Sequence, residues 1–287
     1  MSTFSASNFD SDRYSKSRPS YPAQFYQELS NFHKGSHHCL VDIGCGPGTA
    51  TFQLRKYIPQ FEEYIGCDMS SPMIKKANEK LGETSYENVR FQQSSYEDFS
   101  FLEGQKCDMI TCVEAVHWFD IEKFQQVSFD SLSESGTLAI WGYIDGVLTD
   151  YPQLDNYFQD LTYGPTKMGP YWEQPGKTIL KNKYKDVHID TKLFKEVSRH
   201  TLTPDMIRSP DFRIDSEPLP IVTKMPLQGY MDYIRTWSGY HTWKQENSDK
   251  PDIVEETLNY VLENTDISDP AQEVNVAWNS FYIFARK

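Results

Sequence analysis

A glycine-rich turn near the start of the chain constrains the fold more than any other feature. Residues 41–49 read VDIGCGPGT, which predicts a short apolar strand, a tight turn and the first residues of a helix. Glycines permit positive φ and close approach of a ligand to bare backbone, and the helix that follows presents unpaired N–H groups. The spacing is G-x-G-x-G, and Thr49 stands where the dinucleotide fingerprint G-x-G-x-x-G has its last glycine. The turn therefore predicts a cofactor loop and argues against a nicotinamide dinucleotide.

Short apolar runs alternate with helical patterns around this turn. Expected strands lie at 39–44, 63–68, 88–93, 107–114, 136–143, 193–202 and 274–287. A helical pattern with an Asp120 cap separates the fourth and fifth of them, and further helices are expected at 226–244 and 252–264. Strands that alternate with helices form a mostly parallel sheet with right-handed crossovers. The sequence thus predicts an α/β, doubly wound, mostly parallel seven-stranded sheet.

Changes in residue composition and periodicity along the sequence divide the chain into four expected regions. Residues 1–20 precede the first helix and are expected to form a flap, and 21–148 form the cofactor-binding α/β core. Residues 149–193 are rich in proline, glycine and aromatic residues, which indicates a cap of helices and loops inserted after the fifth strand. Residues 194–287 hold the remaining strands, with inserted helices that are expected to form the substrate pocket.

Composition excludes several classes of partner. The net charge is -13, which disfavours nucleic acid and anionic membrane surfaces. We see no apolar run approaching the roughly 20 residues of a bilayer helix and no secretory signal, so the expectation is a cytoplasmic protein that does not bind membranes. The five cysteines include no C-x-x-C pair, and no metal site is expected.

The register of the glycine turn carries a resemblance to a known family. Val41-Asp42-Ile43 precedes the turn and Asp68 follows Gly48 by 20 residues, a pattern that resembles class I S-adenosylmethionine-dependent methyltransferases, which have a Rossmann-like fold. In that family the glycine loop wraps the methionine part of the cofactor, and an acidic residue at the position of Asp68 accepts both ribose hydroxyls. The cofactor-binding residues implied by the resemblance are Tyr14, Arg18, Asp42, Gly44, Cys45, Gly46, Gly48, Asp68, Met69, Ser95, Tyr96 and Glu114.

Two of these assignments leave alternatives open. Ser95 stands where the family usually has an aspartate beside the adenine. Tyr14 and Arg18 could reach either the cofactor carboxylate or the substrate.

After the fourth expected strand, His117 and Trp118 occupy positions that face the transferred methyl group in this family, and they are the expected catalytic residues. Packing of His117 on Trp118 is the alternative.

A narrower resemblance lies outside the shared fold. The segments RPSYP (18–22), HWFD (117–120), MGPYWEQPG (168–176) and RTWSGYHTW (235–243) are similar to fungal trans-aconitate methyltransferases. Those enzymes esterify one carboxylate of trans-aconitate. The substrate-binding residues that this resemblance implies are Tyr21, Trp172, Lys177, Arg235, Trp237, Tyr240 and His241.

The chemistry of the expected reaction agrees with these residue types. A carboxylate is already anionic and needs no general base, whereas its binding needs cationic donors such as Arg18 and Arg235. The alternatives are an ion pair between Arg235 and Asp232, and core packing for Trp237 and Tyr240. Another small acid or a hydroxyl remains possible as acceptor, and a hydroxyl would require His117 or His241 as base. A cofactor-binding regulatory protein without catalysis is a third hypothesis.

Overall fold

The structure is a computed structural model that describes residues 18–287. Residues 1–17, which include Tyr14 and most of the expected flap, lie outside the described part of the chain. Within it, one sheet of eight strands has the order β3-β2-β1-β4-β5-β8-β6, and β7 also pairs with β8. The strands are β1 Cys39–Ile43, β2 Glu63–Asp68, β3 Val89–Gln93, β4 Cys107–Val113, β5 Leu132–Leu148, β6 Glu196–Leu202, β7 Val222–Pro226 and β8 Glu273–Arg286.

The predicted α/β fold with a mostly parallel sheet is confirmed. Strands β1 to β5 pair in parallel, and β8 runs antiparallel to β5, β6 and β7. The prediction lacked β7, and it placed the start of β5 at residue 136, whereas β5 begins at Leu132. Leu132 pairs with Cys107, and an irregularity follows before Thr137 pairs with Met109.

Helices cover both faces of the parallel strands. On one face pack α2 (Ala23–Phe32), α3 (Thr49–Tyr57) and α4 (Ser71–Gly82), and on the other packs α5 (Ile121–Ser131). Successive side chains of a strand point to opposite faces, so Leu40 joins the first core cluster while Val41 joins the second. Asp120 caps α5 as expected, since its carboxylate accepts the Lys123 N–H at 3.0 Å.

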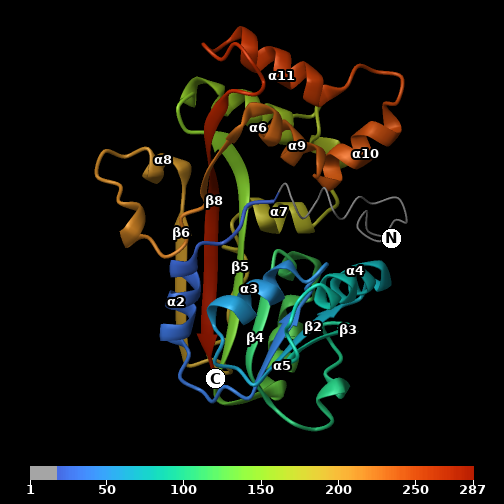
Figure 1. Ribbon diagram of the computed structural model, residues 1–287, viewed down its shortest axis with the longest axis vertical. Helices are drawn as coiled ribbons and strands as arrows, with labels where there is room; N and C mark the ends of the chain where they lie inside the picture. The colour runs from blue at the N-terminus through green and yellow to red at the C-terminus, as the bar shows by residue number, and fades with distance from the viewer. Residues whose placement is uncertain (1–17) are drawn as a thin grey trace.

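Strands β5 and β8 extend beyond the parallel strands, and helices from both the expected cap insertion (149–193) and the expected pocket region (194–287) surround their far ends; these helices together are called the cap below. Figure 1 shows α6, α9, α10 and α11 around their far ends, with α7 between these helices and the rest of the sheet. The helices of this cap are α6 Asp155–Tyr163, α7 Gly176–Lys181, α9 Leu227–Arg235, α10 Ser238–Glu246 and α11 Ile253–Glu263, and the short α8 is Pro204–Ile207. The single helix predicted over 226–244 is wrong, because Trp237 is extended (φ -71°, ψ 138°) and separates α9 from α10.

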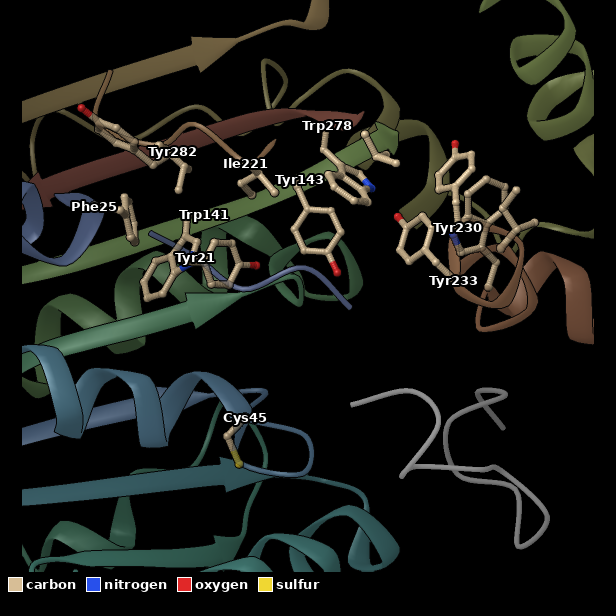
Figure 2. Packing of buried hydrophobic residues seen from close by; sticks show 14 of the residues in the cluster. Tyr21, Phe25, Cys45, Trp141, Tyr143, Ile221, Tyr230, Tyr233, Trp278 and Tyr282 are labelled. Carbon is tan, nitrogen blue, oxygen red and sulfur yellow. The ribbon is translucent and has the colours of Figure 1, made fainter. Parts of the chain in front are cut away.

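A band of aromatic side chains connects the core with the cap. Figure 2 shows Phe25, Tyr21 and Trp141 at one end, Tyr143 and Trp278 in the middle, and Tyr230 and Tyr233 at the cap end. The ring centroids of Phe25 and Trp141 are 5.0 Å apart, and those of Tyr233 and Trp278 are 5.5 Å apart. Aromatic pairs at such separations add to the hydrophobic gain from burial. The band fixes the cap relative to the sheet and so defines the space between them.

Candidate active site

A cavity of about 620 Å³ lies between the carboxyl ends of the parallel strands and the cap. Its lining comes from the glycine turn, from the ends of β2 and β4, from the second half of β5, from α7, and from the junction of α9 and α10. Ligands of open α/β sheets bind at the carboxyl ends of the strands, and small-molecule sites typically enclose about 300–1,000 Å³. Both the position and the size of this cavity suit a cofactor together with a small substrate.

The glycine turn forms one wall of the cavity. The N–H groups of Gly44 and Cys45 donate to the Cys67 carbonyl at 2.8 and 3.0 Å, which ties the turn to the end of β2. Gly46 has φ +54°, and a Cβ built on it would meet no atom of the protein within 4 Å. A Cβ on Gly44 would instead lie 2.5 Å from the Cβ of Ala115. Gly46 therefore leaves backbone open to a ligand, whereas Gly44 allows close packing against the segment after β4.

Asp68 lies at the end of β2 beside the turn. Its Oδ2 accepts the Gly46 N–H at 2.9 Å and its Oδ1 accepts the Ser70 N–H at 2.8 Å. Each carboxylate oxygen retains capacity for a further hydrogen bond. Burial raises the pKa of this carboxyl, an effect that the two N–H donors oppose. Met69, next in the chain, is 68% exposed and lines the cavity with Asp68.

Three residues expected at the cofactor do not line the cavity. Asp42 is fully buried, and its carboxylate accepts hydrogen bonds from Thr51 at 2.6 Å and Thr111 at 2.7 Å. Burial raises its pKa to about 6, although both hydroxyls lower it. Asp42 thus joins β1, α3 and β4 as a structural group. Gly48 begins α3 with φ +80°, and Ser95 is replaced at the cavity by its neighbour Ser94.

Two aromatic rings stack on each other in the cavity lining. Tyr96 lines the cavity as expected, and its ring stacks on Phe119 with centroids 4.3 Å apart. Cys45 also lines the cavity, and burial raises the pKa of its thiol well above the usual value.

Glu114 follows β4 with φ +55° and lines the cavity. Its carboxylate accepts the N–H of Tyr143, and Gly142 leaves the space that this contact needs. Burial raises its pKa to about 7, while the Tyr143 N–H, Arg18 and Lys177 oppose the shift. Glu114 is therefore a carboxyl whose protonation changes near neutral pH.

His117 and Trp118 lie in a turn of 3-10 helix, Val116–Trp118, that directly follows. The Nδ1 of His117 is 2.9 Å from the hydroxyl of Tyr184. Burial, with a smaller effect of Lys177, lowers the pKa of His117 to about 3, so the ring is neutral at physiological pH. Trp118 is 40% exposed and, like His117, lines the cavity.

Two cationic side chains line the cavity near the cap. Lys177 of α7 lies with Nζ 3.7 Å from the centroid of Trp172, and burial lowers its pKa to about 8 against the opposing effect of Asp145 and Glu114. Arg18 donates to the Tyr143 hydroxyl at 3.4 Å, and its guanidinium carbon lies 5.4 Å from the centroid of the Tyr233 ring. Both aromatic contacts are of the cation–π type.

The substrate-binding prediction separates into two groups. Tyr21, Trp172, Lys177 and Trp237 line the cavity. Arg235, Tyr240 and His241 do not. Arg235 instead forms ion pairs with Asp232 at 3.1 Å and with Glu255 of α11. The hydroxyl of Tyr240 donates to Asp252 at 2.7 Å, and His241 packs its ring against that of Tyr240. Because α9 ends at Arg235, the expected continuous helical face does not exist.

The sequence interpretation missed several lining residues. Tyr143 and Asp145 lie in the second half of the long strand β5, just beyond Trp141, which pairs with Val113, the last residue of β4. The strand expected at 136–143 ends at Tyr143, so the rule that ligands bind at the carboxyl ends of parallel strands could have found both residues. Tyr233 of α9 and Ser238 of α10 also line the cavity, and no local sequence pattern predicts that they do.

The lining fits S-adenosylmethionine on structural grounds. Gly46 leaves a backbone cradle that a Cβ would fill, and Asp68 offers two acceptor oxygens suited to a pair of ribose hydroxyls. Glu114 provides a carboxyl group suited to the ammonium of an amino acid moiety. The fold and this site together define a nucleoside-cofactor enzyme of the α/β type.

Comparison with known proteins identifies the family. A methyltransferase domain family matches residues 40–135. The Saccharomyces cerevisiae protein CRG1, named "Probable S-adenosylmethionine-dependent methyltransferase", is 32% identical over 98% of this chain and 96% of its own length. A candidate methyltransferase of Dictyostelium discoideum is 27% identical over 92% of this chain and 89% of its own length. The chain belongs to the S-adenosylmethionine-dependent methyltransferases, and S-adenosylmethionine is its cofactor.

A solved structure supports the fold. A protein of Anaeromyxobacter dehalogenans, described as a candidate type II methyltransferase, aligns with a TM-score of 0.71 at 19% identity, covering 94% of this chain and 97% of its own.

Across residues 18–287 no helix is both long and apolar enough to cross a membrane, and no three His, Cys, Asp or Glu side chains gather as a metal site would require.

Proposed function

We propose that this methyltransferase esterifies a carboxylate of a small organic acid, with trans-aconitate as the first candidate. The observation that carries the proposal is the placement of two cations, Arg18 and Lys177, in the lining of the cofactor cavity. Arginine provides bidentate donors that match a carboxylate, and lysine adds a compact charge. An acid with several carboxylates could use one for each cation and present another to the methyl donor.

The surroundings of the two cations favour an anionic ligand in a dry site. The aromatic side chains Trp118, Trp172 and Trp237 line the same cavity and limit water. With its pKa at about 8, Lys177 is mostly protonated at neutral pH. Glu114 and Asp145 also line the cavity, but each already accepts a hydrogen bond, from the Tyr143 N–H and the Tyr163 hydroxyl respectively.

The titration of His117 supports an acceptor that needs no base. When bound, S-adenosylmethionine supplies an electrophilic methyl group, which a carboxylate oxygen can take directly. The chain then has to hold the acceptor in line and exclude water. A histidine with a pKa of about 3 is a poor proton acceptor at neutral pH. The base role that a hydroxyl substrate would assign to His117 is therefore disfavoured.

A hydroxyl acceptor remains a second candidate because of one observation. Glu114 lines the cavity with a pKa of about 7, which suits a general base. The two candidates predict opposite pH profiles. With Glu114 as base, kcat/KM rises as the pH increases through about 7. For a carboxylate bound by Lys177, kcat/KM falls as the pH increases through about 8, because the ammonium loses its proton.

The proposal is tested by labelled methyl transfer from S-adenosylmethionine to a panel of acids and hydroxyl compounds, with wild type, Lys177→Met and Lys181→Met. Lys181 lies one turn further along α7, with its Nζ over the Tyr163 ring rather than in the cavity lining, and is a matched control. We expect base-labile label on an acid and a raised KM for that acid in Lys177→Met alone. Label on hydroxyl compounds only would overturn the proposal.

A further inference from the structure

Tyr184 lies outside the cavity lining yet contacts the ring of His117. It is fully buried, and its hydroxyl is 2.9 Å from Nδ1 of His117. Its position is well fixed, because its ring packs edge-on against Phe281 with centroids 4.8 Å apart and its N–H donates to the Ile179 carbonyl at 3.3 Å. The phenol therefore cannot turn away from His117 without disturbing the packing of the segment after α7.

The proton in this hydrogen bond can be located from the surroundings. A phenol hydroxyl can donate one hydrogen bond and can also accept. Within residues 18–287 the Tyr184 hydroxyl meets only Nδ1 of His117. If Nδ1 carried the hydrogen and donated to Tyr184, the phenol hydrogen would be left in a fully buried position without an acceptor, which is unfavourable. Donation from Tyr184 to Nδ1 satisfies both groups and places the imidazole hydrogen on Nε2.

The other ring nitrogen, Nε2, is accessible. His117 is only 6% exposed but belongs to the cavity lining. Within the described residues, Nε2 has no hydrogen-bond partner, and protein atoms do not fully enclose it. An N–H at this position is thus free to meet a ligand in the cavity.

We propose that Tyr184 is a positioning residue that holds His117 as the neutral Nε2–H tautomer, so that His117 donates a hydrogen bond to an oxygen of the acceptor substrate. The identity of that oxygen as a carboxylate oxygen rests on the proposed function. The tautomer itself does not, because it follows from the contact between His117 and Tyr184.

The charged and titratable neighbours keep this arrangement constant over a wide pH range. Burial, and to a smaller extent Lys177 of α7, lowers the pKa of His117. Burial raises the pKa of Tyr184 well above its usual value, and Glu114 and Cys112, near the end of β4, add to this shift. Neither partner of the hydrogen bond therefore ionises near neutral pH.

The direct test is ¹⁵N NMR of histidine-labelled, ligand-free protein, with the His117 signals assigned by their loss in His117→Gln. We expect a protonated Nε2 and an unprotonated Nδ1 at both pH 6 and pH 8. In Tyr184→Phe we expect a mixture of both tautomers. A wild-type ring with its hydrogen on Nδ1, a ring that becomes cationic in this range, or an unchanged tautomer in Tyr184→Phe would overturn the proposal.

Kinetics supply a readout that a purely structural role of Tyr184 would not change. Loss of one neutral hydrogen bond corresponds to roughly five- to tenfold in kcat/KM, so we expect a fall of that order in Tyr184→Phe with unchanged affinity for S-adenosylmethionine. Glutamine carries its amide near the position of Nε2, so His117→Gln should retain more activity than His117→Asn. In the His117→Gln background, Tyr184→Phe should have little further effect.

The outcomes separate this proposal from the proposed function. The expected tautomer without methylation of any acid would reject the carboxyl acceptor and leave the fixed donor. Methylation of an acid by a protein whose His117 carries its hydrogen on Nδ1 would support the carboxyl acceptor and reject His117 as a fixed hydrogen-bond donor. Equal kcat/KM in Tyr184→Phe and wild type would reject the positioning role.

Discussion

Replacing His117 with glutamine should remove a pH-dependent part of the free energy of unfolding. The pKa of His117 is about 3 in the folded protein against 6.5 for an unperturbed histidine, mainly because the ring is buried. The unfolded chain therefore binds more protons than the folded protein once the pH falls below the unfolded value. Stability from this group is fully present above that value and decreases as the pH falls from it towards 3.

The size of the effect follows from these two pKa values. Between about pH 7.5 and about pH 5, linkage predicts that wild type loses about 2 kcal/mol more than a variant that cannot titrate at this position. Urea unfolding of wild type and His117→Gln at both pH values measures this difference, and the acidic groups common to both proteins cancel. A constant offset between the two proteins is expected from lost packing. Equal pH dependence in both would refute the burial of a neutral His117.

Four further predictions concern the cavity and its surroundings. Lys177→Met should abolish the fall in kcat/KM above about pH 8 that the proposed function expects, which a pH profile measures. Asp68→Ala should weaken S-adenosylmethionine binding by about 1–3 kcal/mol, measured by calorimetry, since a charged hydrogen-bond acceptor is removed. Gly46→Ala should lose about 1–2 kcal/mol of stability through its positive φ and bind the cofactor more weakly, whereas Gly44→Ala should be far less stable because its Cβ meets Ala115. Arg235→Ala should lower stability by about 1 kcal/mol, as two partly exposed ion pairs are lost, with the substrate KM unchanged.

The glycine turn and Asp68 could be predicted from sequence because a local pattern determines their geometry. The strand, the tight turn and the helix follow one another within residues 39–57, and Asp68 ends the strand that pairs with β1. The prediction of a single helix over 226–244 was wrong because no glycine or proline marks the break between α9 and α10 at Trp237. As a result, Arg235 forms an ion pair with Glu255 of α11, while Trp237 lines the cavity.

Long-range contacts account for the remaining omissions. Tyr184 is 67 residues from His117 in the chain, and the segment between them shows no period that would place the two side chains together. The family resemblance implied Asp42 as a cofactor residue, since it lies in the segment that precedes the glycine turn. Only the structure reveals the hydroxyls of Thr51 and Thr111 that occupy its carboxylate.

The central claim is that the cations of the cavity bind a small acid whose carboxylate receives the methyl group. The most direct measurement is transfer of labelled methyl from S-adenosylmethionine to trans-aconitate, beside cis-aconitate, citrate, isocitrate and unrelated hydroxyl compounds. We predict base-labile label on an acid, with trans-aconitate well above the others. Cofactor binding without label on any acid, together with label on a hydroxyl compound, would contradict the claim.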